Sequence, residues 1–328
     1  MAAPKSTRSR RVRVAMIGAG SMANHVHYPS LASFPDVEIA AVCDLNPERL
    51  HATADRYGIA ARYSDYRQMI EAVAPDAVYA IGPPHHMYDI WLWCLQQGLN
   101  LYIEKPMGMT LHQAQMLAHL AEKNQCITQV SFQRRTCPMI CMLRDECLKR
   151  GPITHAVCEF YKCAPDAMLG AVDHMHDDCV HALDTVRWMC GGELKDLHSV
   201  TRRVGTPDLN FLSALIEFDN GATGLMVNSW TSGRRVFRVQ MHAPGICAEG
   251  EHEGAGHLYA DGDYAGQTFD TKQVAGSDEF HVYAGFAGKN REFIDCLKAR
   301  KLPGSHFGDA VKTMELAERI LAQSLLAG

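Results

Sequence analysis

The sequence predicts an α/β protein in which a doubly wound, mostly parallel sheet precedes an α+β domain with a large, mostly antiparallel, open-faced sheet. Short apolar runs alternate with helical segments through residues 12–134, a glycine-rich turn follows the first run, and a hairpin turn separates two of the later runs. The 328 residues are enough for two domains with separate cores. We therefore expect a basic, disordered leader at 1–11, a first domain at 12–134 and a second domain at 135–328.

The first turn of the predicted sheet carries a nucleotide-binding pattern. The run Val12–Ile17 is followed by Gly18–Ala23, which reads GAGSMA and matches G-x-G-x-x-A, and a second run, Val37–Cys43, ends in Asp44. This order of strand, glycine turn, helix, strand and acid is the Rossmann fingerprint. Its first glycine permits the tight turn, its second lets the backbone approach a pyrophosphate, and the helix N-terminus attracts the phosphates. An isolated match is more often an ordinary turn, but this context predicts a cofactor site.

The acid that ends the second strand indicates which cofactor is used. Asp44 is expected to bind the ribose hydroxyls of the adenosine half and to repel a 2′-phosphate, so NAD is predicted in preference to NADP. Arg49 would partly offset this repulsion, but it is expected on the exposed side of the next helix. The candidate cofactor-binding residues lie in the glycine turn and where strands end: Gly18, Gly20, Ser21, Met22, Asp44, Pro83, His86, Glu104 and Lys105.

Strand and helix signals continue through the first domain. Pro29 lies inside the helical segment 21–34 and predicts a kink or two short helices. Asn46 and Pro47 are expected to begin the next helix as its N-cap and first residue, and that helix is expected to end at Gly58. The remaining elements are expected as strands at 61–63, 77–81, 100–103 and 127–132 and helices at 66–73, 87–97 and 111–124.

The second domain is expected to be dominated by antiparallel strands. Asp219-Asn220-Gly221 predicts a hairpin turn, and the glycine-rich, acidic segment 250–263 is expected to be a solvated loop with short strands. Helices on only one face of a large sheet leave its other face in need of cover, which favours a homodimer or homotetramer through the open sheet. The other elements are expected as strands at 156–162, 194–203, 210–218, 222–230 and 235–242 and helices at 138–149, 178–190, 286–300 and 307–327.

Composition excludes some classes of function. A formal net charge of −5 argues against non-specific nucleic-acid binding, and no apolar run reaches membrane-spanning length. The twelve cysteines form no C-x-x-C pair, so the usual zinc and thioredoxin spacings are absent from the sequence. We therefore expect free thiols in a cytoplasmic protein that binds neither nucleic acid nor membranes.

Further motifs carry a family resemblance. Glu104-Lys105-Pro106 follows the fifth strand, Gln133-Arg134-Arg135 leaves the first domain, and the stretch from Asp177 to Asp184 fits the pattern D-x-x-x-H-x-x-D. Together with the glycine turn and Cys43–Arg49, they make nearly the whole chain resemble the Gfo/Idh/MocA family of glucose–fructose oxidoreductase and inositol dehydrogenase. The resemblance implies an NAD-dependent dehydrogenase that transfers hydride between nicotinamide and a secondary hydroxyl (CH–OH) of a sugar, cyclitol or sugar derivative.

The resemblance also implies the catalytic residues. Lys105 follows a central strand and is expected in the cofactor crevice, where it donates to a substrate hydroxyl or carries a proton; without the fingerprint, a solvated lysine would be the better interpretation. The resemblance assigns the hydroxyl proton to His181, and Asp177, four residues earlier on the same helix face, orients the ring or holds a neighbouring hydroxyl. The alternatives are a helix cap or first-turn position for Asp177 and a core position for His181. The candidate substrate contacts are Lys105, Tyr161, Asp177 and His181, with a core position as the alternative for Tyr161.

The segment 173–181 is rich in residues that bind metals. It contains histidines, aspartates and a cysteine, all of which ligate first-row metals. Richness in ligands is not geometry, and the chemistry implied by the family needs no metal, so no metal site is predicted. Cys179 stands where the family often has glycine, and with His174 and His176 it is expected to reshape the pocket mouth. The identity of the substrate therefore stays open.

Two other functions are compatible with these motifs. One is a glycoside-processing enzyme that keeps NAD bound and uses transient oxidation to allow eliminative cleavage, and turnover without added NAD would indicate it. The other is a non-catalytic sensor of nucleotide or sugar. The joint presence of Lys105, Asp177 and His181 counts against a sensor, because a binding module does not need all three chemical groups.

Overall fold

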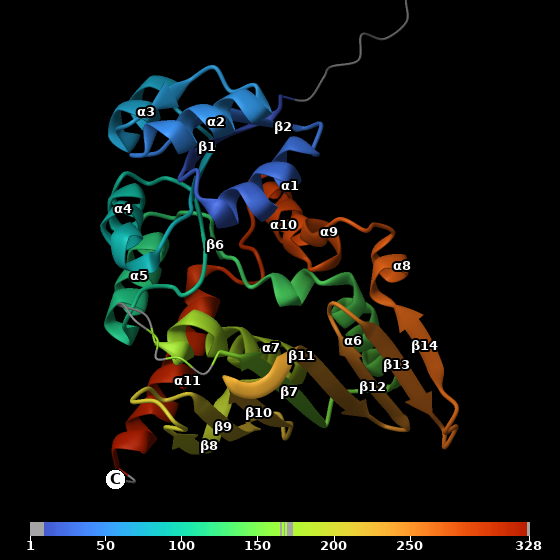
Figure 1. Ribbon diagram of the computed structural model, residues 1–328. Coiled ribbons are helices and arrows are strands. Elements are labelled where there is room, and N and C mark those ends of the chain that lie inside the picture. Colours follow the sequence, from blue (N-terminus) through green and yellow to red (C-terminus); the bar gives the residue numbers. More distant parts are fainter. Residues whose placement is uncertain (1–9, 165, 167, 169–172, 327–328) are drawn as a thin grey trace, which may run out of the picture.

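The computed structural model describes residues 10–164, 166, 168 and 173–326. It is organised by two sheets, one built from the N-terminal part of the chain and one from the part after residue 150 (Figure 1). This arrangement confirms the fold class expected from the sequence. Residues 1–9 of the expected leader lie outside the described residues, whereas Arg10 and Arg11 are placed and pair with Asp76 and Glu38. None of the helices that the structure describes combines the length and apolar character that a membrane crossing requires.

The first sheet has the strand order β3-β2-β1-β4-β5-β6, and each neighbouring pair is parallel. Because the order reverses between β1 and β4, the carboxyl ends of these strands border the crevice in which open α/β sheets bind ligands. The central strands are buried on both faces, as their near-continuous apolar runs predict. The strands are β1 Val12–Ile17, β2 Val37–Cys43, β3 Arg62–Tyr63, β4 Ala77–Ala80, β5 Leu101–Ile103 and β6 Thr128–Val130.

Helices connect these strands and mostly begin where the sequence predicts. Asn46 caps α2 (Pro47–Tyr57) by accepting a hydrogen bond from the backbone N–H of Arg49 at 3.0 Å, and Gly58 ends that helix with a φ of 66°. The segment around Pro29 forms two short helical pieces, of which the first is a π-helical turn. The other helical elements are η1 Ala23–His27, α1 Tyr28–Ala32, α3 Tyr66–Val73, α4 Pro84–Gln96 and α5 Leu111–Lys123.

The second sheet has the strand order β14-β13-β12-β11-β7-β10-β9-β8. Its neighbouring strands are antiparallel except for β7 and β10, which are parallel, and the turn at 219–221 joins β9 to β10 as expected. The strands are β7 His155–Cys163, β8 Leu194–Arg202, β9 Phe211–Phe218, β10 Thr223–Ser229, β11 Thr231–Ala243, β12 Ile246–Glu251, β13 Ala255–Ala260 and β14 Gln267–Asp270.

The segment 250–263, expected to be a solvated loop with short strands, is mostly strand in the structure. This segment contains the end of β12 and all of β13, which pair as a hairpin within the sheet. Its glycines serve close packing instead: a Cβ at Gly250 would lie 2.8 Å from Cδ1 of Leu143, and one at Gly256 would lie 2.4 Å from Sδ of Met139. Both contacts come from α6 (Pro138–Arg150), so the glycines let this helix sit directly on the strands.

Helices cover one face of the second sheet. They are α6, α7 (Val180–Cys190) and α11 (Phe307–Leu326), which pack on its strands (Figure 1). The helix α10 (Phe286–Ala299) instead returns to the first sheet, where Phe293 packs edge-on against Tyr79 and Tyr102. The remaining helical elements are η2 Gln133–Thr136, η3 Met175–Cys179, α8 Thr271–Ala275 and α9 Phe280–Tyr283.

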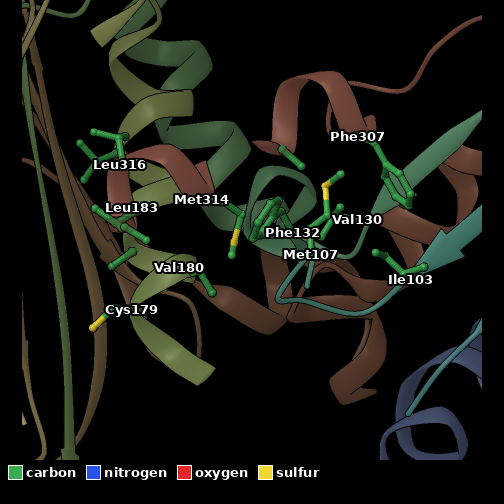
Figure 2. Close-up of a cluster of buried hydrophobic side chains, with 14 of the residues drawn as sticks. Ile103, Met107, Val130, Phe132, Cys179, Val180, Leu183, Phe307, Met314 and Leu316 are labelled. Atoms are coloured by element: carbon green, nitrogen blue, oxygen red, sulfur yellow. The ribbon is translucent and has the colours of Figure 1, made fainter. Parts of the chain in front are cut away.

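An apolar cluster joins the first sheet to the helices of the second. Figure 2 shows Phe132, just after β6, together with Val180 and Leu183 of α7 and Met314 of α11. All four side chains are buried. Burial of this kind contributes about 1.5–3 kcal/mol for each large apolar side chain. The start of α7 is therefore fixed against the carboxyl end of the first sheet.

Candidate active site

The glycine turn presents bare backbone at the carboxyl end of β1. Gly18 has a φ of 107°, and a Cβ there would lie 1.9 Å from the backbone oxygen of Ile81, so only glycine fits. A Cβ at Gly20 would meet nothing within 4 Å, which leaves the approach to its backbone open. Ser21 and Met22 follow as exposed residues of the first helical turn. A tight turn below an open backbone is the cradle that a dinucleotide pyrophosphate requires, and these residues fit NAD.

Asp44 is held against this turn. Its Oδ2 accepts a hydrogen bond from the backbone N–H of Ala19 at 2.7 Å, and its Oδ1 accepts one from the backbone N–H of Asn46 at 2.8 Å. Each carboxylate oxygen keeps capacity for a further donor, such as a ribose hydroxyl. Arg49 is exposed on α2, as expected.

The next strands place the remaining candidates for cofactor contact. Pro83 precedes α4 at the end of β4, and His86 is exposed in the first turn of that helix, with its ring 4.1 Å from the ring of His85. Glu104 is buried and accepts a hydrogen bond from Nε2 of His27 at 2.9 Å, while its other oxygen accepts one from the backbone N–H of Lys105. Glu104 is therefore engaged by protein groups and fixes the backbone from which Lys105 extends.

Lys105, which follows β5 of the first sheet, contacts Asp177, which lies in η3 of the second domain. Nζ of Lys105 donates to the backbone oxygen of Asp177 and lies 3.3 Å from its Oδ1. The lysine side chain is 12% exposed and the aspartate side chain is 39% exposed. The ammonium group thus lies in a largely enclosed position at the end of β5, close to the start of the helix that carries His181.

The helix that holds Asp177 begins earlier than expected. Asp173, rather than Asp177, is its cap, because the backbone N–H of His176 donates to Oδ1 of Asp173 at 2.8 Å. Asp177 lies in the first turn of η3, the π-helical turn that precedes α7. Since Asp173 supplies the capping oxygen, the carboxylate of Asp177 is left for Lys105.

His181 lies one turn further along and is 7% exposed. Its ring packs against Phe132, with 6.4 Å between ring centroids, and its Nδ1 is buried with no hydrogen-bond partner among the described residues. Burial, together with the positive charges of Lys105, Arg134 and Lys162, lowers the pKa of His181 well below its usual range. The imidazole is therefore neutral near pH 7 and able to accept a proton.

The metal-binding residue types of segment 173–181 make separate contacts. His174 stacks on Trp230 with 4.2 Å between ring centroids, and Nδ1 of His176 lies 2.8 Å from Oδ1 of Asp173. Asp178 pairs with Lys162, and Cys179 is fully buried. No group of three or more potential ligands gathers in the part of the chain that the structure describes.

Tyr161 is not brought to this cluster. Its hydroxyl donates to Oε1 of Glu159 at 2.7 Å, on the face of β7 away from the helices. Because side chains alternate along a strand, Lys162 faces the site instead and pairs with Asp178. Sequence reasoning also missed Arg134, which lies close enough to affect His181. The Gln133-Arg134-Arg135 stretch was the available signal, but a run of polar residues does not show which arginine faces the site.

Comparison with known proteins places these features in context. Residues 12–132 match a family model described as an oxidoreductase family with an NAD-binding Rossmann fold, and residues 153–243 match a model of a Gfo/Idh/MocA C-terminal domain. The chain is 30% identical to the rhizopine catabolism protein MocA of Rhizobium meliloti, over 66% of this chain and 70% of that protein. It is 24% identical to scyllo-inositol 2-dehydrogenase (NAD(+)) of Bacillus subtilis, over 68% of each.

Other similarities are more local or concern the fold alone. A 35% identity to D-glucoside 3-dehydrogenase of Escherichia coli covers 39% of this chain and 36% of that protein. A dehydrogenase from Chromobacterium violaceum superposes with a TM-score of 0.87 at 20% identity, covering 97% of this chain and 98% of that one. Levoglucosan dehydrogenase in complex with NADH and L-sorbose superposes with a TM-score of 0.82 at 16% identity, covering 96% of each chain.

Proposed function

The chain belongs to the Gfo/Idh/MocA family of NAD-binding oxidoreductases, and on that premise we propose that it is a dehydrogenase for a secondary hydroxyl of a sugar, cyclitol or sugar derivative. The observation that carries the proposal is that Lys105, at the carboxyl end of the first sheet, contacts Asp177 and lies near enough to the buried ring of His181 for its charge to lower the pKa of that ring. The similarity to scyllo-inositol 2-dehydrogenase supports a polyhydroxylated substrate. NAD is proposed in preference to NADP, because Asp44 would repel a 2′-phosphate.

The proposed chemistry divides among three side chains. NAD, when bound, takes the hydride from the substrate carbon. The neutral ring of His181 accepts the hydroxyl proton as the C–H bond breaks, and Lys105 donates a hydrogen bond to the same oxygen. Asp177 holds the ammonium of Lys105 in place. In the reverse direction His181 returns the proton, so the same residues serve oxidation and reduction.

Substitution of the two central residues tests this function. Lys105→Ala and His181→Ala are each expected to lower kcat roughly 10²- to 10⁴-fold, because each removes a group that interacts with the moving proton. NADH formation is measured at saturating NAD across a panel of sugars and inositols, and NAD binding is measured separately. His198→Ala is a matched control, since that side chain is 79% exposed on β8. Near-normal turnover in either variant with NAD still bound would remove that residue from the mechanism.

The open face of the second sheet supports the proposal of a homodimer or homotetramer. Leu215 of β9 and Leu225 of β10 are paired across the sheet, and they are 45% and 37% exposed. Neighbouring exposed leucines are typical of a surface that is covered in an assembly. A monomer in light scattering would contradict this proposal. The cysteines are all free thiols and all lie within the described residues, which supports the proposal of a reducing compartment such as the cytoplasm.

A further inference from the structure

Four positively charged side chains lie near enough to His181 or His252 to lower the pKa of these rings, and three of the four have a carboxylate partner. These three pairs are Lys105 with Asp177, Lys162 with Asp178, and Arg235 with Glu253. Arg134 is the fourth, and no carboxylate of the described residues pairs with it. The residues outside the described part carry no acidic side chain. The charge of Arg134 is therefore left without a matching side chain from its own chain.

Arg134 is deeply enclosed rather than solvated. It lies in η2, directly after β6, and is 4% exposed. Its Cζ lies 4.5 Å from the ring centroid of Phe237, and its Nε and Nη1 are buried with no hydrogen-bond partner in the described structure. The face of an aromatic ring attracts a cation but does not accept its directed N–H bonds.

An unpaired guanidinium at this depth is costly. Burial lowers the pKa of Arg134 only to about 10, so the group keeps its charge near pH 7. Buried charges in proteins are normally paired, because removing an ion from water is compensated only by an opposite charge or by full hydrogen bonding. A buried cation that has no carboxylate partner and lies beside a reacting group is therefore typical of a site that binds an anionic ligand.

Arg134 lies close to the histidine rings of the site. Its positive charge contributes to the lowered pKa of both His181 and His252, so it lies near both rings. Phe132, two residues earlier, contacts the ring of His181, and His252 packs edge-on against Phe237 with 5.4 Å between centroids. Arg134 thus lies near the proposed proton acceptor and packs on Phe237 of the second sheet.

We propose that the substrate is a sugar acid, a polyhydroxylated molecule with one carboxylate, and that Arg134 binds this carboxylate. The proposal rests on the dehydrogenase function proposed above and names its substrate class. A single uncompensated positive charge matches a carboxylate, whereas a phosphate monoester brings nearly two negative charges. The planar guanidinium also suits a planar carboxylate, with which it forms paired hydrogen bonds.

Matched acidic and neutral sugars test the inference. D-glucuronate is compared with D-glucose, and D-galacturonate with D-galactose, in NADH formation and in thermal unfolding of the NAD-loaded protein. The native protein is expected to prefer the acids, and Arg134→Met is expected to raise KM for the acids roughly 10- to 100-fold with a smaller change in kcat. KM and kcat for the neutral sugars are expected to stay the same in Arg134→Met. Arg134→Lys is expected to show a smaller increase in KM for the acids than Arg134→Met. Arg144→Met is the control, since Cζ of Arg144 also lies 4.5 Å from an aromatic ring, that of Trp188, but outside the site.

The outcomes separate this inference from the proposed function. NADH formation from neutral sugars as well as from acids, or an unchanged preference in Arg134→Met, overturns the inference and leaves the dehydrogenase function in place. Preference for D-glucose 6-phosphate over D-glucuronate, or binding of neither acid, also overturns it. Selective binding of the acids that is lost in Arg134→Met, without NADH formation, supports the inference and contradicts the dehydrogenase function.

Discussion

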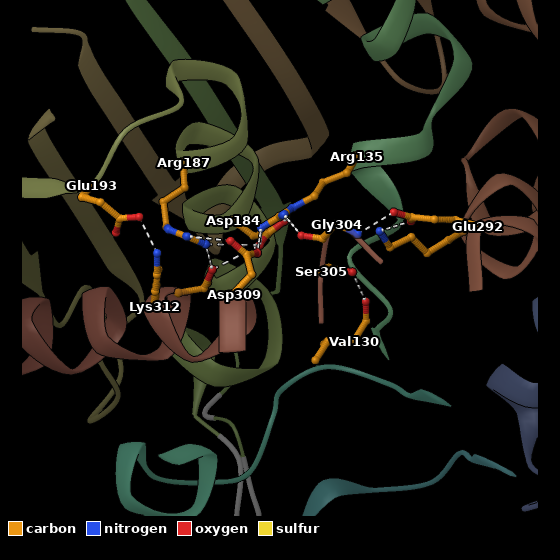
Figure 3. Close-up of polar contacts among 12 residues, drawn as sticks. Val130, Arg135, Asp184, Arg187, Glu193, Glu292, Gly304, Ser305, Asp309 and Lys312 are labelled. Atoms are coloured by element: carbon orange, nitrogen blue, oxygen red, sulfur yellow. Dashed lines mark hydrogen bonds and ion pairs between the residues drawn. The ribbon is translucent and has the colours of Figure 1, made fainter. Parts of the chain in front are cut away.

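Arg134 and Arg135 are consecutive residues of η2, yet their surroundings differ. Arg135 donates from Nη2 to Oδ1 of Asp184 at 2.5 Å and from Nη1 to the backbone oxygen of Gly304 at 2.8 Å, and its Nη2 forms an ion pair with Oδ2 of Asp309 at 2.7 Å (Figure 3). Burial opposes its charge, but Asp184 and Asp309 raise its pKa above the usual value. Arg134 has no such partner, and burial lowers its pKa. The charge of Arg135 is therefore balanced by nearby carboxylates, whereas the charge of Arg134, which lies near His181, is not.

The surroundings of the two arginines indicate different roles. The network around Arg135 joins the end of the first domain to α7 and α11, and Arg187 pairs with Asp309 as part of it (Figure 3). Its arginines and aspartates are paired with one another within the chain, which is what a structural joint needs. The side that faces His181 keeps polar groups unpartnered, which is tolerated where a ligand completes them.

Substitution of each arginine is expected to give the largest difference between them. Arg135→Met leaves Asp184, which is 1% exposed, without its main partner, and the free energy of unfolding is expected to fall by about 3–5 kcal/mol. Arg134→Met strands no carboxylate and removes a buried charge that has no carboxylate partner, so the free energy of unfolding is expected to stay the same or to rise by about 1 kcal/mol. Chemical denaturation of both variants measures the difference. Equal losses would show that the two arginines are equivalent.

The surroundings of Arg134 and of Arg135 are also expected to lose their contributions to the free energy of unfolding in different pH ranges. On the site side, burial and the nearby charge of Arg134 lower the pKa of His252 to about 4, so folded His252 stays neutral where the unfolded chain is protonated. The free energy of unfolding is therefore expected to fall as pH drops below about 6.5, by up to roughly 3 kcal/mol at pH 4. On the network side, burial favours neutral Asp309, but Arg135 and Arg187 outweigh it and lower the pKa. That contribution is fully present above the unfolded pKa of about 3.8 and is lost only below it.

Denaturation series from pH 7.5 down to pH 4 check this order. His252→Phe is expected to reduce the slope in this range, because it removes one of the two buried imidazoles of the site that stay neutral in the folded protein, the other being His181. Asp309→Asn is expected to leave the slope as it is. An unchanged slope in His252→Phe would assign the loss to other groups.

The smallest effect concerns Asp44, whose carboxylate is held by backbone N–H groups instead of by an arginine. Asp44→Asn keeps one acceptor oxygen but removes the negative charge that we propose faces the adenosine ribose. The preference for NAD over NADP is expected to fall about 10-fold, equivalent to about 1.4 kcal/mol. The ratio of kcat/KM for the two cofactors measures it. A native enzyme that uses both cofactors equally would contradict the role given to Asp44.

Much of the first domain could be predicted because its signals are local. The glycine turn, the cap at Asn46 and the apolar runs each depend on residues within a few positions of one another. Where local signals are ambiguous, the sequence predicts less: segment 250–263 resembles a solvated loop with short strands in composition, but it is mostly strand and its glycines accommodate Leu143 and Met139 of α6. Tyr161 was placed in the site because the loose alternation of β7 does not fix which face meets the helices.

Residue identity and short spacing were enough to predict the family and the Rossmann turn, and they indicated the candidate side chains for proton transfer. Only the tertiary structure decided which charges are paired. Lys105 and Asp177 are 72 positions apart, and Arg135 and Asp184 are 49 positions apart, so no local pattern links them. The same long-range packing left Arg134 without a carboxylate partner among the described residues. Electrostatic pairing depends on distance in space, and it is therefore settled only when the two sheets come together.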